Sequence, residues 1–341
     1  MKAFIITLSV ILIIVGGATV FFTFAANDFD GHKIGKDNSV TTSYEITEDF
    51  NSIIIDDEVG YHDIKIEISS SGKCEIVHTG KDYVTLERSV RDGKLVLKTV
   101  NTKGFFGRFS FFGFSSSQIT VSVPEKDYEK LSVDSSSGYV RINGVNAKAT
   151  SVDLSSGEIY LNGITTENLE LETSSGDISL TEVIASTKAN IDTTSGSFNA
   201  SKLGVGAFEC ELTSGEFKVR DLIATGRVEI ESGSGDVEIF NAIAKSLSIE
   251  TTSGDIELVN FVASESITID TTSGEIDFES CDALNVRIET TSGDVEGTLL
   301  SAKSFDAKAT SGDVRVPSND GNGGNCFVRT TSGDIEIRVK G

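Results

Sequence analysis

The chain of 341 residues has no Trp, one Met, two Pro and three His, and its basic residues are far outnumbered by acidic ones. All three His lie in the first quarter of the chain, which leaves few groups for His-based catalysis or a zinc site. Lys and Arg number 29 against 52 Asp and Glu, a net charge of −23. Binding to nucleic acid and adhesion to anionic headgroups both need cationic surfaces. We therefore expect no nucleic-acid partner and no simple electrostatic adhesion to lipid.

The sequence also has few signs of catalysis or of a structural metal. G-x-S-x-G and H-E-x-x-H motifs are absent, and the four cysteines show no CxxC spacing. Some carbohydrate-cleaving β-helices hold Asp clusters in a groove, but the repeat described below is too uniform to form such a cleft. We expect a protein that is not an enzyme, with a carbohydrate-active surface enzyme as the less favoured alternative.

One long hydrophobic run stands at the start of the chain. Residues 3–25 contain no charged side chain, and as a helix rising ~1.5 Å per residue they span roughly 34 Å, enough for a bilayer core. Lys2 precedes the run and acidic residues follow it, which predicts a cytoplasmic N-terminus and an extracellular remainder. The alternative is a cleaved signal peptide, although signal h-regions are usually about 7–15 residues long. We expect residues 1–26 to be the cytoplasmic start and transmembrane anchor of a single-pass cell-membrane protein.

The last two-thirds of the chain carries a Ser-Gly pair at intervals of 19 to 21 residues. A fixed period of this length is typical of stacked repeat architectures. Apolar residues stand two and four positions after most of these glycines, and five and seven positions before them. This period of two predicts strands and excludes helix. The repeat glycines are Gly138, Gly157, Gly176, Gly196, Gly215, Gly235, Gly254, Gly274, Gly293, Gly312 and Gly333.

The pattern predicts an all-β protein in which residues 128–341 form a single-stack β-solenoid of about eleven coils, each of ~19–20 residues. We expect two short strands in each coil, with one apolar row on each side of the glycine. Stacking at the ~4.8 Å inter-strand spacing buries these rows, and glycine supplies the positive φ of a sharp corner. Residues 27–127 lack the repeat but alternate as strands do, which predicts an N-terminal β cap and spacer.

Two sequence features resemble a known bacterial group. The iterated T-T-S-G-D-I-E motif and the run Q-I-T-V-S-V-P-E from residue 118 are similar to the "putative adhesin" domain-of-unknown-function family, whose members are membrane-anchored β-strand-repeat (Ser-Gly-Asp repeat) proteins. The resemblance covers roughly residues 50–341 and identifies the fold better than the role. It implies an adhesin-like protein of the cell surface with a link to cell-envelope stress, and it brings no catalytic residues.

Acidic residues recur at two fixed offsets from the repeat glycines, and residues 128–341 hold 35 acidic and 16 basic residues. Like charges ~4.8 Å apart repel by about 1 kcal/mol even in water, so such rows favour bound cations or screening salt. We predict a ladder of weak Ca²⁺ sites, with a solvated face that keeps the rod soluble as the alternative. No other cofactor is expected. The candidate ligands are Asp177, Glu231, Asp236, Glu250, Asp255, Asp270, Glu275, Glu289, Asp294 and Asp313.

A Phe-rich segment, G-F-F-G-R-F-S-F-F-G-F, occupies residues 104–114. It could form an exposed apolar patch that contacts a membrane or a protein partner, or a hairpin tip that folds over the open core. The candidate contact residues are Phe105, Phe106, Phe109, Phe111, Phe112 and Phe114.

These observations predict a membrane-anchored, non-catalytic structural or interaction protein, with an envelope protein or a polysaccharide as its partner. The alternative is a self-stacking scaffold that forms polymers. In that case the final strand, at residues 334–339, offers its edge to a second rod, although Arg338 and Lys340 oppose such pairing.

Overall fold

The computed structural model describes residues 39–102, 117–318 and 323–340, which contain strands and no helix. Before the repeat come β1 (Ser39–Ile46), β2 (Ser52–Asp57), β3 (His62–Ile68), β4 (Cys74–Lys81), β5 (Val84–Arg91), β6 (Lys94–Asn101) and β7 (Ser117–Val123). The repeat region begins with β8 (Tyr128–Ser135), β9 (Tyr139–Asn143), β10 (Ala147–Ser156), β11 (Glu158–Asn162), β12 (Thr165–Ser175), β13 (Ile178–Ser195), β14 (Phe198–Ser214), β15 (Phe217–Ala224) and β16 (Arg227–Ser234). It continues with β17 (Val237–Ser253), β18 (Ile256–Ser273), β19 (Ile276–Cys281), β20 (Asn285–Ser292), β21 (Val295–Leu299), β22 (Ser304–Ser311), β23 (Val314–Arg315), β24 (Asn325–Ser332) and β25 (Ile335–Val339).

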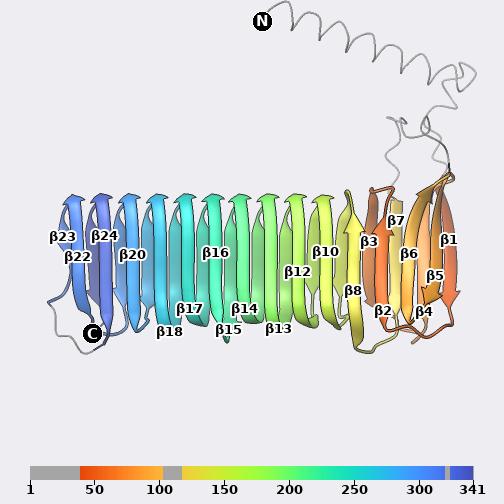
Figure 1. The fold of residues 1–341 in the computed structure, drawn as a ribbon, viewed down its shortest axis with the longest axis horizontal. Coiled ribbons are helices and arrows are strands. Elements are labelled where there is room, and N and C mark those ends of the chain that lie inside the picture. Colours follow the sequence, from red (N-terminus) through yellow and green to blue (C-terminus); the bar gives the residue numbers. More distant parts are fainter. Residues whose placement is uncertain (1–38, 103–116, 319–322, 341) are drawn as a thin grey trace, which may run out of the picture.

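These strands stack side by side into one long rod (Figure 1). In the repeat region every pairing is parallel and in register, so that Ile230 of β16 pairs with Ile249 of β17, which pairs with Ile269 of β18. Because side chains alternate between the two faces of a strand, this register places equivalent residues in straight rows along the rod. The predicted all-β solenoid is confirmed.

Each central coil has three straight segments, one more than the sequence pattern predicted. In β13, pairing with β14 runs over residues 178–181, 183–185 and 188–195. Glu182, with a φ of 54°, separates the first segment from the second. This extra residue shifts the side-chain alternation by one position, so that the odd-numbered residues of the second segment point inward. The prediction of two strands per coil is therefore wrong for these coils, because the shift in phase concealed the additional segment.

The corner after the first segment recurs six positions after successive repeat glycines. Its residue has a φ between 54° and 68° in each of these coils. Left-handed backbone is tolerated best by Gly, Asn and Asp, and three of the later coils use Asp or Asn. The residues at this corner are Gly144, Gly163, Glu182, Lys202, Asp221, Asn241, Asn260 and Ser280.

The Ser-Gly corner is stricter, because the backbone of the adjacent coil lies directly against it. All of the repeat glycines have positive φ, between 113° and 147°. A Cβ built on Gly254 lies 2.2 Å from the carbonyl oxygen of Gly235 and 2.6 Å from its carbonyl carbon. No side chain fits at that distance, so glycine is required both for its φ and for the close approach of the coils.

One hydrophobic core runs along the inside of the rod. Inward residues from all three segments of the central coils belong to a single buried cluster. Near the middle, the rings of Phe198, Phe208 and Phe217 pack against one another with centroids 5.3–6.0 Å apart. A coil cannot bury its apolar row alone, so each coil depends on its neighbours for stability.

The parallel stack extends into the part of the chain that precedes the repeat. Strand β2 lies between β6 and β8, and β3 lies between β7 and β9. Antiparallel strands then end this side of the stack, because β5 pairs with β6, β4 pairs with β7, and β1 pairs with β4.

At the opposite end, the last two coils are stacked in the reverse of their order in the chain. Strand β24 lies between β20 and β22, and β25 lies between β21 and β23 (Figure 1). The chain thus passes the position next to β20–β21, forms the terminal coil β22–β23, and returns to fill the gap. Strand β25 pairs with β21 along its whole length and with β23 at Ile335 and Glu336. The edge that the final strand was predicted to offer is therefore covered at these two residues.

Two predictions concern residues outside the described ranges. The transmembrane helix was predicted at residues 3–25, and the Phe-rich contact segment at residues 104–114. Within the described part of the chain, no helix is long and apolar enough to cross a membrane. The anchor and the Phe contact therefore stay predictions.

The close packing at the Ser-Gly corner leads to a stability prediction. Replacing Gly254 by Ala adds a Cβ against the Gly235 carbonyl and forces Ala to adopt a φ of 121°. We expect the free energy of unfolding to fall by about 3 kcal/mol or more. The matched control is Gly163→Ala, where φ is 62° and no atom lies within 4 Å of the added Cβ, so the loss should be about 1 kcal/mol. Equal losses in urea unfolding of the two variants would contradict the steric argument.

Candidate functional site

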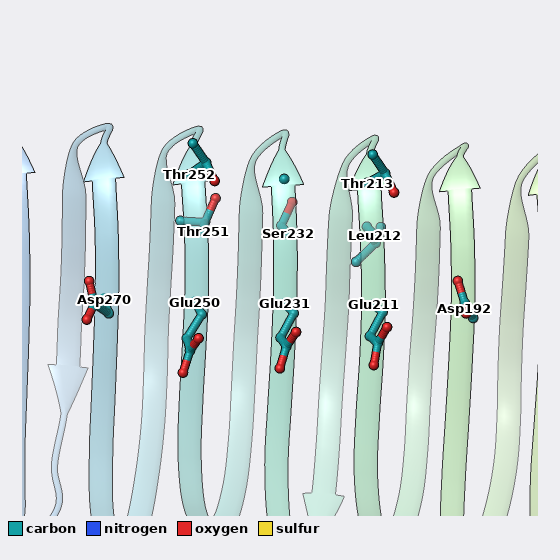
Figure 2. Close-up of a pocket in the computed structure, with 11 residues that line it drawn as sticks. Asp192, Glu211, Leu212, Thr213, Glu231, Ser232, Glu250, Thr251, Thr252 and Asp270 are labelled. Atoms are coloured by element: carbon teal, nitrogen blue, oxygen red, sulfur yellow. The ribbon is translucent and has the colours of Figure 1, made fainter.

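The first set of acidic residues forms an outward row on the side of the rod, and five of its members, Asp192, Glu211, Glu231, Glu250 and Asp270, line a shallow groove. Each member stands four positions before a repeat glycine and points outward, and neighbours such as Glu211 and Glu231 pair in register. Figure 2 shows five of these carboxylates in a line across neighbouring coils, with hydroxyl side chains nearer the turns. The groove has a volume of about 530 Å³. We call these residues the groove row: Asp134, Asp153, Glu172, Asp192, Glu211, Glu231, Glu250, Asp270 and Glu289.

Tertiary pairing places a basic residue at each end of the groove row. At one end Asp56 pairs with Asp134 and with Lys98, whose Nζ lies 3.3 Å from Asp56 Oδ2. At the other end Glu289 pairs with Arg329 of the exchanged coil. The repeat spacing alone could not reveal these ends, because they depend on which coils become neighbours.

The second set of acidic residues lies across the Ser-Gly turn and does not line the groove. We call it the corner row: Glu158, Asp177, Glu216, Asp236, Asp255, Glu275, Asp294, Asp313 and Asp334. The predicted ligands therefore divide between two places. Glu231, Glu250 and Asp270 line the groove, and Glu289 continues its row. The other six, Asp177, Asp236, Asp255, Glu275, Asp294 and Asp313, belong to the corner row.

The Asp residues of the corner row hold adjacent coils together. In five of these six Asp residues one carboxylate oxygen accepts a hydrogen bond from the backbone N–H at the equivalent position of the adjacent coil. This role explains why Asp is common there, since the longer Glu side chains at this position make no such bond among those described. The acceptor and donor pairs are Asp177 with Ser197 (2.8 Å), Asp236 with Asp255 (2.9 Å), Asp255 with Glu275 (2.9 Å), Asp294 with Asp334 (2.8 Å) and Asp334 with Asp313 (2.8 Å).

Repulsion between stacked carboxylates raises several pKa values. The pKa of Glu172 is raised, first by the charge of Asp153 and then by partial burial and by Asp192. In the corner row, the charge of Asp277 is the main cause of the raised pKa of Glu275. At these two positions neighbouring carboxylates repel each other, and bound cations would relieve that repulsion.

Buried hydroxyl groups stand beside the groove row. Thr251 and Ser232 line the groove one position after Glu250 and Glu231. The Thr251 hydroxyl donates to the carbonyl oxygen of Ser253 (3.2 Å), whereas the buried Ser232 hydroxyl has no hydrogen-bond partner. Such groups can supply neutral oxygen atoms next to the carboxylates. Across residues 39–102, 117–318 and 323–340, no group of three or more His, Cys, Asp or Glu side chains is arranged to hold a metal ion.

A buried polar cluster that sequence reasoning missed lies in the N-terminal part of the rod. The ring of His62 contacts Asp57 through Nδ1 and Oδ1 (2.8 Å) and His78 through the two Nε2 atoms (3.3 Å). The hydroxyls of Thr99 and Ser135 donate to the same carboxylate, at 2.6 and 3.0 Å. Burial raises the pKa of Asp57, but the hydrogen bond and charge of His62 outweigh it and lower the pKa to about 2. Burial, reinforced by the charge of His62, lowers the pKa of His78 to about 4.

All four cysteines are buried and free. Burial raises the pKa of the Cys74 and Cys281 thiols to about 11 and that of Cys326 to about 12, so these side chains remain neutral. They fill space in the core, as free cysteines commonly do.

A straight stack of parallel coils with an acidic groove defines a β-solenoid of the stacked-repeat class. Within that class, the chain belongs to the Toastrack DUF4097 family, whose sequence model matches residues 50–242 and 225–341. The resemblance to a domain-of-unknown-function family is thereby confirmed. No curated protein gives a significant match.

Solved structures that match the chain come from Parabacteroides and Bacteroides species. A putative adhesin from Parabacteroides distasonis is 16% identical, with 76% of this chain and 98% of that chain covered and a TM-score of 0.43. A putative lipid binding protein from the same species is 20% identical, with coverage of 77% and 95% and a TM-score of 0.40. A putative adhesin from Bacteroides fragilis is 16% identical, with coverage of 89% and 98% and a TM-score of 0.32. At these levels the likeness carries no argument about function.

The bond made by Asp255 gives a prediction that separates hydrogen bonding from charge. Asp255→Ala removes the acceptor of the Glu275 N–H, and we expect a loss of about 1 kcal/mol in the free energy of unfolding. Asp255→Asn keeps the side-chain oxygen and removes one charge from the row, so it should be at least as stable as the native chain. Chemical unfolding of both variants tests this. Equal free energies of unfolding for the two variants would show that the Asp255 side-chain oxygen does not stabilise the contact between coils.

The cluster around His62 predicts acid sensitivity. The unfolded chain protonates His78 near its ordinary pKa of 6.5, whereas the folded protein resists protonation until about pH 4. Stability should therefore fall as pH drops from 6.5 towards 4, by up to about 1.4 kcal/mol per pH unit. Asp57 adds a further loss between pH 3.8 and about 2.

The measurement is the free energy of unfolding across this pH range for the native chain and for His78→Gln. The difference between the two chains cancels the contribution of other carboxylates, such as Glu172 and Glu275, whose raised pKa values act in the opposite direction. We expect His78→Gln to be less stable near neutral pH and to show a flatter profile. Parallel profiles would exclude His78 as the titrating group.

Proposed function

We propose that the protein is a membrane-anchored extracellular rod that acts without catalysis, by presenting its groove row to cationic groups. The observation that carries this proposal is the unbroken line of carboxylates along the groove (Figure 2). Coil stacking sets their spacing at ~4.8 Å, so their repulsion is built into the fold. A row of Ca²⁺ ions, or the basic groups of an envelope partner, would relieve it.

The chemistry of the groove suits calcium in particular. Calcium takes 6–8 oxygen ligands from carboxylates, neutral oxygens and water. Two carboxylates from adjacent coils, such as Glu231 and Glu250, supply part of such a set. The remaining ligands would be water, which favours weak binding in the millimolar range typical of extracellular modules.

The uniformity of the groove supports a role in binding over one in catalysis. Each coil along it presents an acidic side chain at the same position, whereas a catalytic site gathers unlike groups in one place. A repeated surface instead suits a ligand that is itself extended. An envelope protein or a polysaccharide is the partner we propose.

The proposal also includes the placement of the rod. Residues 3–25 would anchor the end that carries β1, β4 and β5, and these antiparallel strands would cap the stack there. The terminal coil β22–β23 would then point away from the membrane. An adhesin-like role and a link to envelope stress follow from the family resemblance and form part of this proposal.

The test compares the thermal midpoint of the full chain, in detergent solution, with chelator and with about 1 mM Ca²⁺, using Mg²⁺ at equal ionic strength as the control. We expect a calcium-specific rise of several degrees. The triple variant Glu231→Gln/Glu250→Gln/Asp270→Asn should lose that rise. The matched control, Asp236→Asn/Asp255→Asn/Asp294→Asn, removes as many charges from the corner row and should keep it. Equal thermal midpoints in Ca²⁺ and Mg²⁺ would contradict the proposal of calcium sites.

A further inference from the structure

The second segment of the central coils carries an exposed apolar stripe. Pairing between β13, β14, β15, β17 and β18 places one residue of each coil in a single outward row. Four of the five are branched aliphatic side chains. Their exposed fractions are 49% for Ile184, 63% for Ile223, 60% for Ile243 and 38% for Val262. We call this row the apolar stripe: Ile184, Gly204, Ile223, Ile243 and Val262.

The stripe is unlike the other outward rows of the rod in its electrostatics. The charged groups beside it are joined in ion pairs, Lys202 with Glu182 (2.7 Å) on one side and Lys245 with Glu265 (3.3 Å) on the other. Asp221 accepts a hydrogen bond from Asn241. The groove and corner rows, by contrast, are lines of like charge. Two copies of a chain with a net charge of −23 therefore repel each other least where these stripes meet.

We infer that the apolar stripe is the contact surface for a second copy of this chain, with the two rods antiparallel. The order of residues along the stripe specifies the register. With the two-fold axis at Ile223, Ile184 of each rod faces Val262 of the other. Ile243 then faces Gly204, where the missing side chain leaves a gap. Parallel rods in register would instead oppose Gly204 to Gly204 and leave the gap unfilled.

The size of the stripe sets the strength of this association. The exposed parts of its four side chains amount to roughly 400 Å² per copy, about half of what a stable interface of standard size buries on each partner. The contact is therefore weak between free chains and becomes significant where chains are held at high local concentration. An acidic rod is not drawn to anionic headgroups, which favours a second copy over a lipid surface as the occupant.

Cysteine cross-linking of the full chain tests the contact, because the four native thiols are buried. Ile223→Cys places a thiol on the proposed axis and should give disulfide-linked dimers on mild oxidation. The control is Glu257→Cys, an exposed position on β18 outside the stripe, which should give several times less dimer. Equal yields at the two positions, or products of Ile223→Cys linked only to other proteins, would overturn the proposal.

Two further variants test the register. Ile184→Cys alone should cross-link poorly, since four coil steps separate it from Val262 and its own counterpart lies far away. Mixed with Val262→Cys, it should form heterodimers efficiently. Self-linking of Ile184→Cys as strong as that of Ile223→Cys would exclude the antiparallel register.

The variant Gly204→Val distinguishes packing in the proposed register from nonspecific hydrophobic association. An added Cβ at this position meets only the side chain of Ile184, at 3.6 Å, so the fold should tolerate it. Valine fills the gap that receives Ile243, and we expect the Ile223→Cys dimer to form about tenfold less readily, a change of about 1.4 kcal/mol. Increased dimer formation on this more apolar surface would contradict the register. Thermal unfolding of Gly204→Val confirms that any loss is not a loss of fold.

Discussion

The backbone contact at the Ser-Gly corner is the constraint on which the rest of this structure depends. Each repeat glycine lies against the carbonyl of the adjacent one, closer than any Cβ would allow. With the corners packed in this way, the coils stack in register, and every other position of the repeat becomes a straight row. The core, the acidic groove, the corner row and the apolar stripe are all consequences of that register.

The register also imposes a cost, because equivalent carboxylates are stacked at the inter-strand spacing. The molecule offsets this cost differently in its two acidic rows. In the corner row, Asp side chains accept hydrogen bonds from the backbone of the next coil, so the carboxylates join the coils that their charges push apart. In the groove row the charges face open solvent, with bases at the two ends. The groove row is therefore the surface on which a cationic ligand would neutralise the most negative charge.

The three segments of the coil divide the surface of the rod into regions of different chemistry. The third segment, before the Ser-Gly turn, carries the acidic groove, and the second segment carries the apolar stripe. The two surfaces can act independently, since one favours oppositely charged ligands and the other favours an uncharged, self-complementary contact.

Local periodicity was sufficient to predict the all-β solenoid and the glycine corners, because a period of two around a fixed glycine indicates which residues face inward. Periodicity could not report which coil would lie next to which. The exchange of β24–β25 with β22–β23, the Lys98 and Arg329 ends of the groove row, and the His62–Asp57–His78 cluster all arise from contacts between distant parts of the chain. The second segment of each central coil escaped prediction because one left-handed residue shifts its phase. The sequence by itself thus determined the coil, through local alternation and the steric demands of glycine. Only the tertiary structure decided the order of the coils and the surfaces they form, because pairing across long separations depends on the whole stack.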